Sequence, residues 1–113
     1  MVGAVLVDDA NRIVASGYNG SPRGLPHCME VGCILDSDGH CIRSIHAEEN
    51  AILQCAIHGI STEGLTLYST HRPCTRCTMR LFQAGIRTVF YLTEYQGQTS
   101  IPGMRIEKVE KSK

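Results

Sequence analysis

The sequence predicts an α/β fold in which helices pack against one mixed sheet. Two segments have helical spacing and glycines that can end a helix, and short apolar runs of strand character stand before, between and after them. The resulting order is strand–strand–helix–strand–helix–strand, for which parallel strands joined by helices are the economical arrangement. The 113 residues are close to the commonest domain size, so we expect residues 1–113 to form a single domain.

The N-terminal part begins with a predicted β-hairpin. Residues 2–7 (VGAVLV) and 12–18 (RIVASGY) have extended character, and the polar residues between them form the turn. Residues 19–26 contain two glycines and two prolines, which indicates a loop. Residues 28–43 have no regular period, so we expect irregular structure there.

Two helices and three further strands are predicted in the rest of the chain. The first helix covers residues 46–58 and ends at Gly59. The second has Pro73 in its first turn, runs to Ala84 and ends at Gly85. The three strands are expected at residues 65–69, 86–92 and 104–109. If the helices follow adjacent parallel strands, both helix N-termini open on the same sheet edge, where open α/β sheets hold their ligands.

The composition excludes several classes of protein. Lys plus Arg and Asp plus Glu both number 11, and a formal net charge of zero argues against a protein that coats nucleic acid or a membrane surface. No apolar run approaches the roughly 20 residues that span a bilayer, and the N-terminus lacks a signal-peptide pattern. We therefore expect a cytoplasmic protein without nucleic-acid or membrane partners.

Cysteine and histidine are unusually frequent, with six and five copies. In a secreted mini-protein, six cysteines would indicate three disulfides. Here the cysteines stand beside histidines or in a Cys-x-x-Cys pair, and the sequence shows no export signal. The pattern therefore favours metal ligands in a reducing compartment over disulfides.

The beginnings of the two predicted helices carry the candidate metal ligands. Cys74 and Cys77 are three residues apart, so both thiolates project from one face of a first turn, where the helix N-terminus favours the thiolate form. His46 and Glu48 are two residues apart, but first-turn side chains lean toward the N-terminal end, so both can reach the helix mouth. We therefore expect His46, Cys74 and Cys77 to bind a metal ion.

This ligand set is typical of a catalytic zinc site. One imidazole and two thiolates leave the fourth tetrahedral position to water, and Glu48 is then the catalytic base that takes a proton from that water. The competing interpretation is a structural zinc knuckle, which needs a fourth protein ligand and no carboxylate two residues after its histidine. For Glu49 we expect only the ordinary role of an acid at a helix N-terminus.

Three motifs in order give the chain a family resemblance. They are residues 17–24 (GYNGSPRG), 46–52 (HAEENAI) and 73–77 (PCTRC), and the last two contain the H-x-E…P-C-x-x-C pattern of nucleobase deaminases. From about residue 2 to about residue 95, the chain resembles the deoxycytidylate (dCMP) deaminases of the zinc-dependent cytidine/deoxycytidylate deaminase superfamily. The resemblance implies a three-layer α/β/α cytidine-deaminase-like fold with a central mixed sheet of about five strands.

The resemblance also implies a reaction: hydrolysis of dCMP to dUMP and ammonia, which supplies dUMP for thymidylate synthesis. Glu48 would take a proton from the attacking water, deliver it to N3 of the cytosine, and carry a second proton to the departing amino group. The substrate contacts that the family implies come from the side chain of Asn19, the backbone of Ala47 and Tyr95. Arg23 is the first candidate for the phosphate, and its rivals are Arg43, Arg76 and Arg80.

Further expectations come from the same resemblance. The family implies homo-oligomers, hexamers in particular, that dCTP activates and dTTP inhibits, with Mg²⁺ accompanying the nucleotide and residues 17–24 near the effector. Some members hold a second, structural zinc, for which we expect Cys28, Cys33 and Cys41 as ligands. Cys55 lies among apolar residues and is expected in the core. Family members usually carry a helix before the first strand, and this sequence starts at that strand, so we expect either that the helix lies outside these residues or that something else covers that face of the sheet.

Two other functions stay open at this point. The first is a tRNA adenosine or free-nucleobase deaminase of the same superfamily, although the zero net charge argues against RNA because phosphate contacts need a basic surface. The second belongs to a different class, a non-catalytic zinc-binding module. Such a module would behave identically when Glu48 is replaced by Gln.

Overall fold

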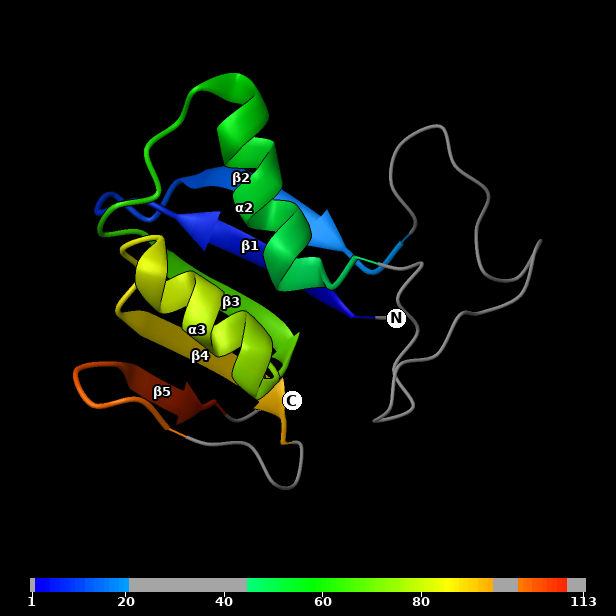
Figure 1. Ribbon diagram of the computed structural model, residues 1–113, viewed down its shortest axis with the longest axis vertical. Coiled ribbons are helices and arrows are strands. Elements are labelled where there is room, and N and C mark those ends of the chain that lie inside the picture. Colours follow the sequence, from blue (N-terminus) through cyan, green and yellow to red (C-terminus); the bar gives the residue numbers. More distant parts are fainter. Residues whose placement is uncertain (1, 21–44, 95–99, 110–113) are drawn as a thin grey trace.

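The computed structural model describes residues 2–20, 45–94 and 100–109, and in this part of the chain it contains five strands and two helices (Figure 1). In chain order they are β1 (Gly3–Val7), β2 (Ile13–Tyr18), α2 (Ala47–His58), β3 (Thr66–His71), α3 (Thr75–Gln83), β4 (Thr88–Thr93) and β5 (Arg105–Lys108). The order of strands and helices is the one that the sequence predicts.

The strands form one mixed sheet in the order β2-β1-β3-β4-β5. Strand β1 pairs antiparallel with β2 and with β3, whereas β3, β4 and β5 run parallel. Helix α3 joins the adjacent parallel strands β3 and β4, as expected. Helix α2 joins β2 to β3, which are parallel to each other but separated by β1, so the expectation of two adjacent pairs is wrong in that detail. Long-range pairing of β1 causes the difference.

Both helices lie on the same face of the sheet (Figure 1), and the core forms between them and the strands. Side chains alternate along each strand, so that Leu67 and Val89 are fully buried beneath the helices. Leu81 of α3 and Cys55 of α2 close the core from the helix side, and both are fully buried. The prediction that Cys55 is a core residue is confirmed.

The opposite face of the sheet carries an aromatic pair. Tyr68 of β3 and Phe90 of β4 stand side by side in register, and their rings stack with 5.2 Å between centroids. The Arg105 guanidinium lies over the Phe90 ring at 5.3 Å and forms an ion pair with Glu107. These side chains point away from the helices, because they occupy the strand positions that alternate with the buried ones.

The helix ends follow local signals with one exception. Helix α2 ends at Gly59, whose φ of 68° is the left-handed conformation that glycine favours, and its N–H donates to Ala56 O. Helix α3 differs from the prediction: Cys74 is its N-cap, so Pro73 stands before the helix rather than in its first turn. Its C-cap is Ala84, one residue before the predicted Gly85. In residues 2–20, 45–94 and 100–109, neither helix is long and apolar enough to cross a membrane.

Candidate active site

The N-terminal ends of α2 and α3 meet at one edge of the sheet. Each helix follows the carboxyl end of a parallel strand, β2 or β3, so both helices begin at the same edge. His46 is the N-cap of α2 and Cys74 is the N-cap of α3. The predicted juxtaposition of the two motifs is therefore present in the structure.

The three expected metal ligands come together at this edge. His46 Nδ1 is 3.6 Å from Cys74 Sγ and 3.3 Å from Cys77 Sγ. The three donor atoms lie within 4.8 Å of one another, and in the described residues the group contains no fourth His, Cys, Asp or Glu. Zinc–sulfur bonds of about 2.3 Å and zinc–nitrogen bonds of about 2.0 Å in a tetrahedron place ligand atoms roughly 3.5 Å apart. The donor set and its spacing thus fit a zinc ion held by three protein ligands.

The surroundings of Cys74 favour the thiolate form of its sulfur. Hydrogen bonding from the Cys77 side chain and the His46 ring lowers the pKa of Cys74 to about 3, although burial opposes the shift. The backbone N–H of Cys77 also donates to Cys74 Sγ at 3.4 Å, as expected for a helix N-cap. The pKa of His46 is raised, chiefly by its hydrogen bond with Cys74. Because thiolates bind metal, these hydrogen bonds favour the form of Cys74 that can act as a ligand.

Glu48 lies buried beside these ligands. The residue is 4% exposed, and among the described residues its Oε2 atom has no hydrogen-bond partner. Burial raises the pKa of Glu48. The negative charge of Glu48 in turn raises the pKa of His46 and of Cys77. A buried carboxyl oxygen without a protein partner is costly unless another group binds it. Glu48 therefore has one buried carboxyl oxygen that is available to a further group.

The loop after β2 holds the first turn of α2. The side chain of His46 does not cap the helix; instead the Ala47 N–H donates to Asn19 Oδ1 at 2.9 Å, and Asn50 Nδ2 donates to the carbonyl of Tyr18 at 3.1 Å. A Cβ atom on Gly17 would lie 2.6 Å from Ala51 N and would also overlap the Ala47 carbonyl. Glycine thus permits the close approach that brings Asn19 to the start of α2. Sequence reasoning did not find this helix-capping role.

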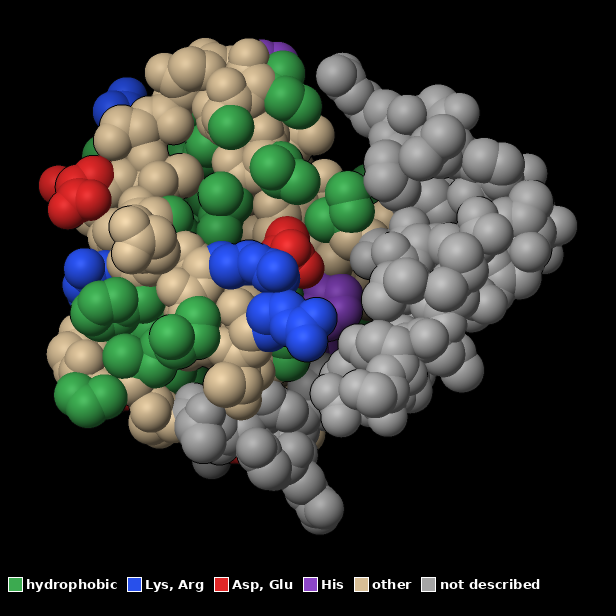
Figure 2. Space-filling model, viewed as in Figure 1, with side chains coloured by type: hydrophobic (Ala, Val, Ile, Leu, Met, Phe, Trp, Pro, Cys, Tyr) green, Lys and Arg blue, Asp and Glu red, His purple; other side chains and the backbone are tan. Residues whose placement is uncertain are grey.

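Glu49 is not only an acidic residue at a helix N-terminus, because it also contacts side chains of α3. Cys77 Sγ lies 3.6 Å from Glu49 Oε1, and Glu49 Oε2 forms an ion pair with Arg80 at 2.9 Å. Glu49 lies one turn after His46 on α2, and Arg80 lies one turn after Cys77 on α3. Their ion pair therefore joins the same two helices as the metal ligands. Figure 2 shows basic side chains next to an acidic and a histidine side chain near the middle of this face of the molecule. Of the rival phosphate candidates, Arg76 and Arg80 are both exposed, and Arg80 forms the ion pair with Glu49.

Several expected site residues lie outside the described part of the chain. They are Arg23, Cys28, Cys33, Cys41, Arg43 and Tyr95. Another residue was missed by sequence reasoning: Arg72, directly before the Pro-Cys pair, forms an ion pair with Glu94 at 3.1 Å. Its only sequence signal was its position beside the motif.

Comparisons with known proteins agree with this site. Residues 1–93 match the family described as the cytidine and deoxycytidylate deaminase zinc-binding region. The chain is 46% identical over 115 residues to ComE operon protein 2 of Bacillus subtilis, a match covering 96% of this chain and 60% of that protein. It is 38% identical over 100 residues to deoxycytidylate deaminase of Saccharomyces cerevisiae, covering 84% of this chain and 31% of that protein.

A solved structure supports the same relationship. The crystal structure of dCMP deaminase from the cyanophage S-TIM5 in complex with dCMP and dUMP matches with a TM-score of 0.79 and 36% identity, covering 96% of this chain and 80% of that one. The expected cytidine-deaminase-like fold with a five-stranded mixed sheet is therefore confirmed. Of the three expected α/β/α layers, the described residues contain the sheet and one layer of helices, because α2 and α3 lie on the same face. By the family match over residues 1–93, the chain belongs to the cytidine and deoxycytidylate deaminase family.

Proposed function

We propose that this chain forms the catalytic site of a zinc-dependent hydrolase that converts dCMP and water to dUMP and ammonia. The observation that carries the proposal is the buried, unpartnered Oε2 of Glu48 beside three converging metal-ligand atoms. Similarity to the deoxycytidylate deaminases, one of them solved with dCMP and dUMP, supports this choice of substrate.

His46, Cys74 and Cys77 are the proposed zinc ligands. When bound, the zinc ion supplies Lewis acidity that makes water a nucleophile near neutral pH. Two thiolates reduce the charge at the metal, so a protein base matters more than in a site with three neutral histidines. Glu48 provides that base, because its carboxyl group is buried within reach of the ligands' charges.

The proposed catalytic role of Glu48 is to carry protons. It accepts a proton from the water that attacks C4 of the cytosine and delivers this proton to N3. It then takes the remaining proton of the new hydroxyl group and passes it to the departing amino group, which leaves as ammonia. Burial raises the pKa of Glu48, which suits the steps in which this carboxyl group donates a proton, because its protonated form is then easier to reach.

Asn19 and Ala47 are the proposed substrate contacts in the described part of the chain. Asn19 Oδ1 accepts from the Ala47 N–H, which leaves the Nδ2 group of Asn19 as the donor for a sugar hydroxyl. A pyrimidine carbonyl that binds at Ala47 must share its N–H with Asn19 or replace Asn19 there. Tyr95 and Arg23 complete the proposed contacts, with Arg23 on the phosphate.

The finer expectations belong to the same proposal and rest on family resemblance. They are a homo-oligomer of hexameric type, regulation by dCTP and dTTP with Mg²⁺, and a second zinc at Cys28, Cys33 and Cys41. The chain spans 60% and 31% of the two curated relatives given above, so these features concern a whole protein that can extend beyond it.

The test compares ammonia release from dCMP, CMP, deoxycytidine and adenosine by the zinc-loaded protein. We expect dCMP to be the preferred substrate, and Glu48→Gln to lower turnover by about 10²–10⁴-fold while zinc stays bound. Glu63→Gln removes an exposed carboxylate and is the matched control, with unchanged turnover. Preference for adenosine would instead support an adenosine deaminase, and a zinc-loaded protein that turns over none of these compounds would be a zinc-binding module.

A further inference from the structure

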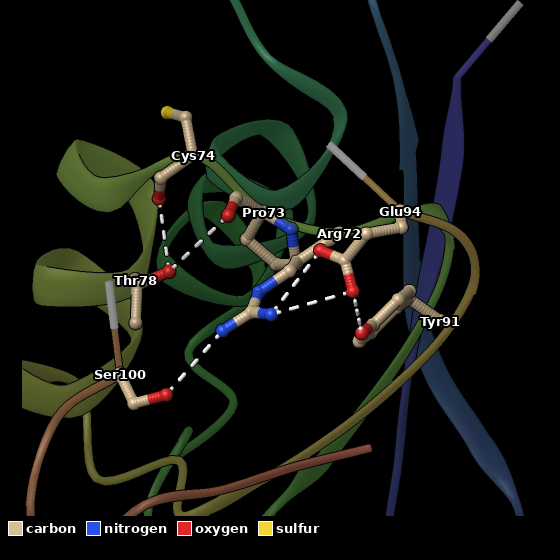
Figure 3. Close-up of polar contacts among 7 residues, drawn as sticks. All are labelled: Arg72, Pro73, Cys74, Thr78, Tyr91, Glu94 and Ser100. Atoms are coloured by element: carbon tan, nitrogen blue, oxygen red, sulfur yellow. Dashed lines mark hydrogen bonds and ion pairs between the residues drawn. The ribbon is translucent and has the colours of Figure 1, made fainter. Parts of the chain in front are cut away.

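A cluster of polar side chains surrounds Arg72, the residue that joins β3 to the Pro-Cys pair (Figure 3). Arg72 Nη1 donates to both carboxylate oxygens of Glu94, at 3.1 and 3.4 Å, and Nη2 donates to Ser100 Oγ at 3.4 Å. The Tyr91 hydroxyl donates to Glu94, and the Tyr91 ring lies 5.6 Å from the guanidinium carbon. The Arg72 side chain is only 16% exposed. One guanidinium group thus links the end of β3, the end of β4 and the chain before β5.

The main chain around Arg72 is fixed to the same neighbours. Its N–H donates to the carbonyl of Thr93 at 2.9 Å, a bond that belongs to the last pair of the β3–β4 ladder, His71 with Thr93. Pro73 is fully buried, and the Thr78 hydroxyl donates to the carbonyl of Cys74 at 2.9 Å. The turn that carries Cys74 is therefore held from the strand side by Arg72 and from the helix side by Thr78, as Figure 3 shows.

We propose that Arg72 is a positioning residue of the metal centre, which holds the turn carrying Cys74 so that its sulfur stays beside His46 Nδ1 and Cys77 Sγ. Cys77 lies inside α3, which packs in the core, whereas Cys74 stands at the strand–helix turn. Its position therefore depends on that turn. This inference rests on the zinc site of the proposed function and does not depend on the substrate.

The contacts around residue 72 need the several hydrogen-bond donors of an arginine side chain. A guanidinium group presents several N–H donors in a fixed plane, so it can bind Glu94 and Ser100 at once while stacking on Tyr91. A lysine ammonium is a compact charge that can satisfy one of these partners at a time. Arg72→Lys should consequently restore only part of what Arg72→Met removes.

The experiment measures how fast the zinc-loaded full chain releases zinc to a chromogenic chelator. We expect Arg72→Met to release zinc about tenfold faster than the parent, at the lower end of what loss of outer-shell support costs, with Arg72→Lys in between. The matched control is Arg105→Met, because Arg105 also combines an ion pair with an aromatic contact, to Glu107 and Phe90, on the opposite sheet face. We expect Arg105→Met to release zinc at the parent rate.

Co²⁺ substitution distinguishes positioning of Cys74 from a general effect on stability. The absorption bands of the Co²⁺-substituted protein report the thiolate geometry. If Arg72 positions Cys74, these bands shift in Arg72→Met and stay constant in Arg105→Met. Equal zinc release and unchanged bands in Arg72→Met, or the same acceleration in both variants, would overturn the inference. If Arg72→Met does not fold, the isosteric Glu94→Gln takes its place, and parent-like release from that variant overturns the inference too. A parent protein that holds no zinc would overturn the proposed function as well.

Discussion

The side-chain oxygen of Asn19 accepts a hydrogen bond from the backbone N–H of Ala47, 2.9 Å away and 28 positions later in the chain. The loop after β2 thus caps the helix that carries His46 and Glu48. Asn19→Ala removes this acceptor, and we expect it to lower the free energy of unfolding by about 1 kcal/mol, as for loss of other helix caps. Denaturant unfolding of the zinc-loaded protein measures the change.

A second variant separates the cap from the proposed sugar contact. Asn19→Asp keeps an oxygen that can accept from the Ala47 N–H and adds a negative charge that a helix N-terminus favours. We expect it to retain parent stability but to raise KM for dCMP, because the Nδ2 donor is gone. An unchanged KM would mean that Asn19 acts only as a helix cap.

Gly17 is required by close packing. A Cβ atom there would lie 2.6 Å from Ala51 N and 3.0 Å from Asn50 Cβ, against the backbone of α2 that cannot rotate away. We therefore expect Gly17→Ala to lower the free energy of unfolding by about 3 kcal/mol, the upper end for overpacking. Gly3→Ala is the control on the neighbouring strand, because its Cβ would meet its nearest atom at an ordinary 3.9 Å. Equal unfolding midpoints for the two variants would contradict this explanation.

Local signals explain which parts of the fold could be predicted. Gly59 ends α2 where the sequence indicates, because a left-handed residue after a helix is a property of a few neighbouring residues. The place of β1 between β2 and β3 depends on pairing across about 60 residues, as in the register of Leu6 with Leu67, and no local pattern specifies it. The sequence predicts Pro73 in the first turn of α3, but the helix begins two residues later, at Thr75, because Cys74 is the N-cap.

In the candidate site, too, local sequence patterns predict some residues and not others. His46, Cys74 and Cys77 could be predicted because metal chemistry restricts the residue types and their spacing. The residues that hold these ligands in place could not, because asparagine and arginine are common on any surface and their partners are distant. Arg72 and Glu94 are separated by 22 positions, and only the parallel pairing of β3 with β4 brings them together.

Loss of one metal ligand tests the coupling between zinc and stability. Cys77→Ala should bind one zinc equivalent fewer than the parent, because a site with two remaining ligands holds the ion weakly. Free zinc at about 100-fold its Kd stabilises a protein by about 2.7 kcal/mol, so removing zinc should lower the unfolding midpoint of the parent and leave that of Cys77→Ala nearly constant.

Cys55→Ala is the control for this experiment. Cys55 is a fully buried core residue on α2, and its replacement lowers stability without touching the ligands. The variant should keep both its zinc content and the drop in midpoint on chelation. Loss of zinc from Cys55→Ala would show that metal content follows stability rather than ligand identity. Metal analysis and thermal unfolding with and without chelator provide the two measurements.

The turn between β1 and β2 predicts an acid-sensitive contribution to stability. Asp8 Oδ1 accepts hydrogen bonds from the backbone N–H groups of Arg12, at 3.0 Å, and Ala10, at 2.9 Å. These bonds lower the pKa of Asp8 in the folded protein, and the one from the Arg12 backbone has the largest effect on it. A carboxyl group with a lowered folded-state pKa stabilises the protein above its unfolded pKa of about 3.9, and loses this effect as the pH falls through the folded value.

Asp8→Asn keeps an oxygen acceptor but has no carboxylate to protonate. We therefore expect the parent to unfold at a higher temperature than Asp8→Asn at pH 7, with the difference shrinking below about pH 4. A difference that is constant from pH 7 to the acid limit would show that the hydrogen bonds, and not the charge of Asp8, stabilise the turn.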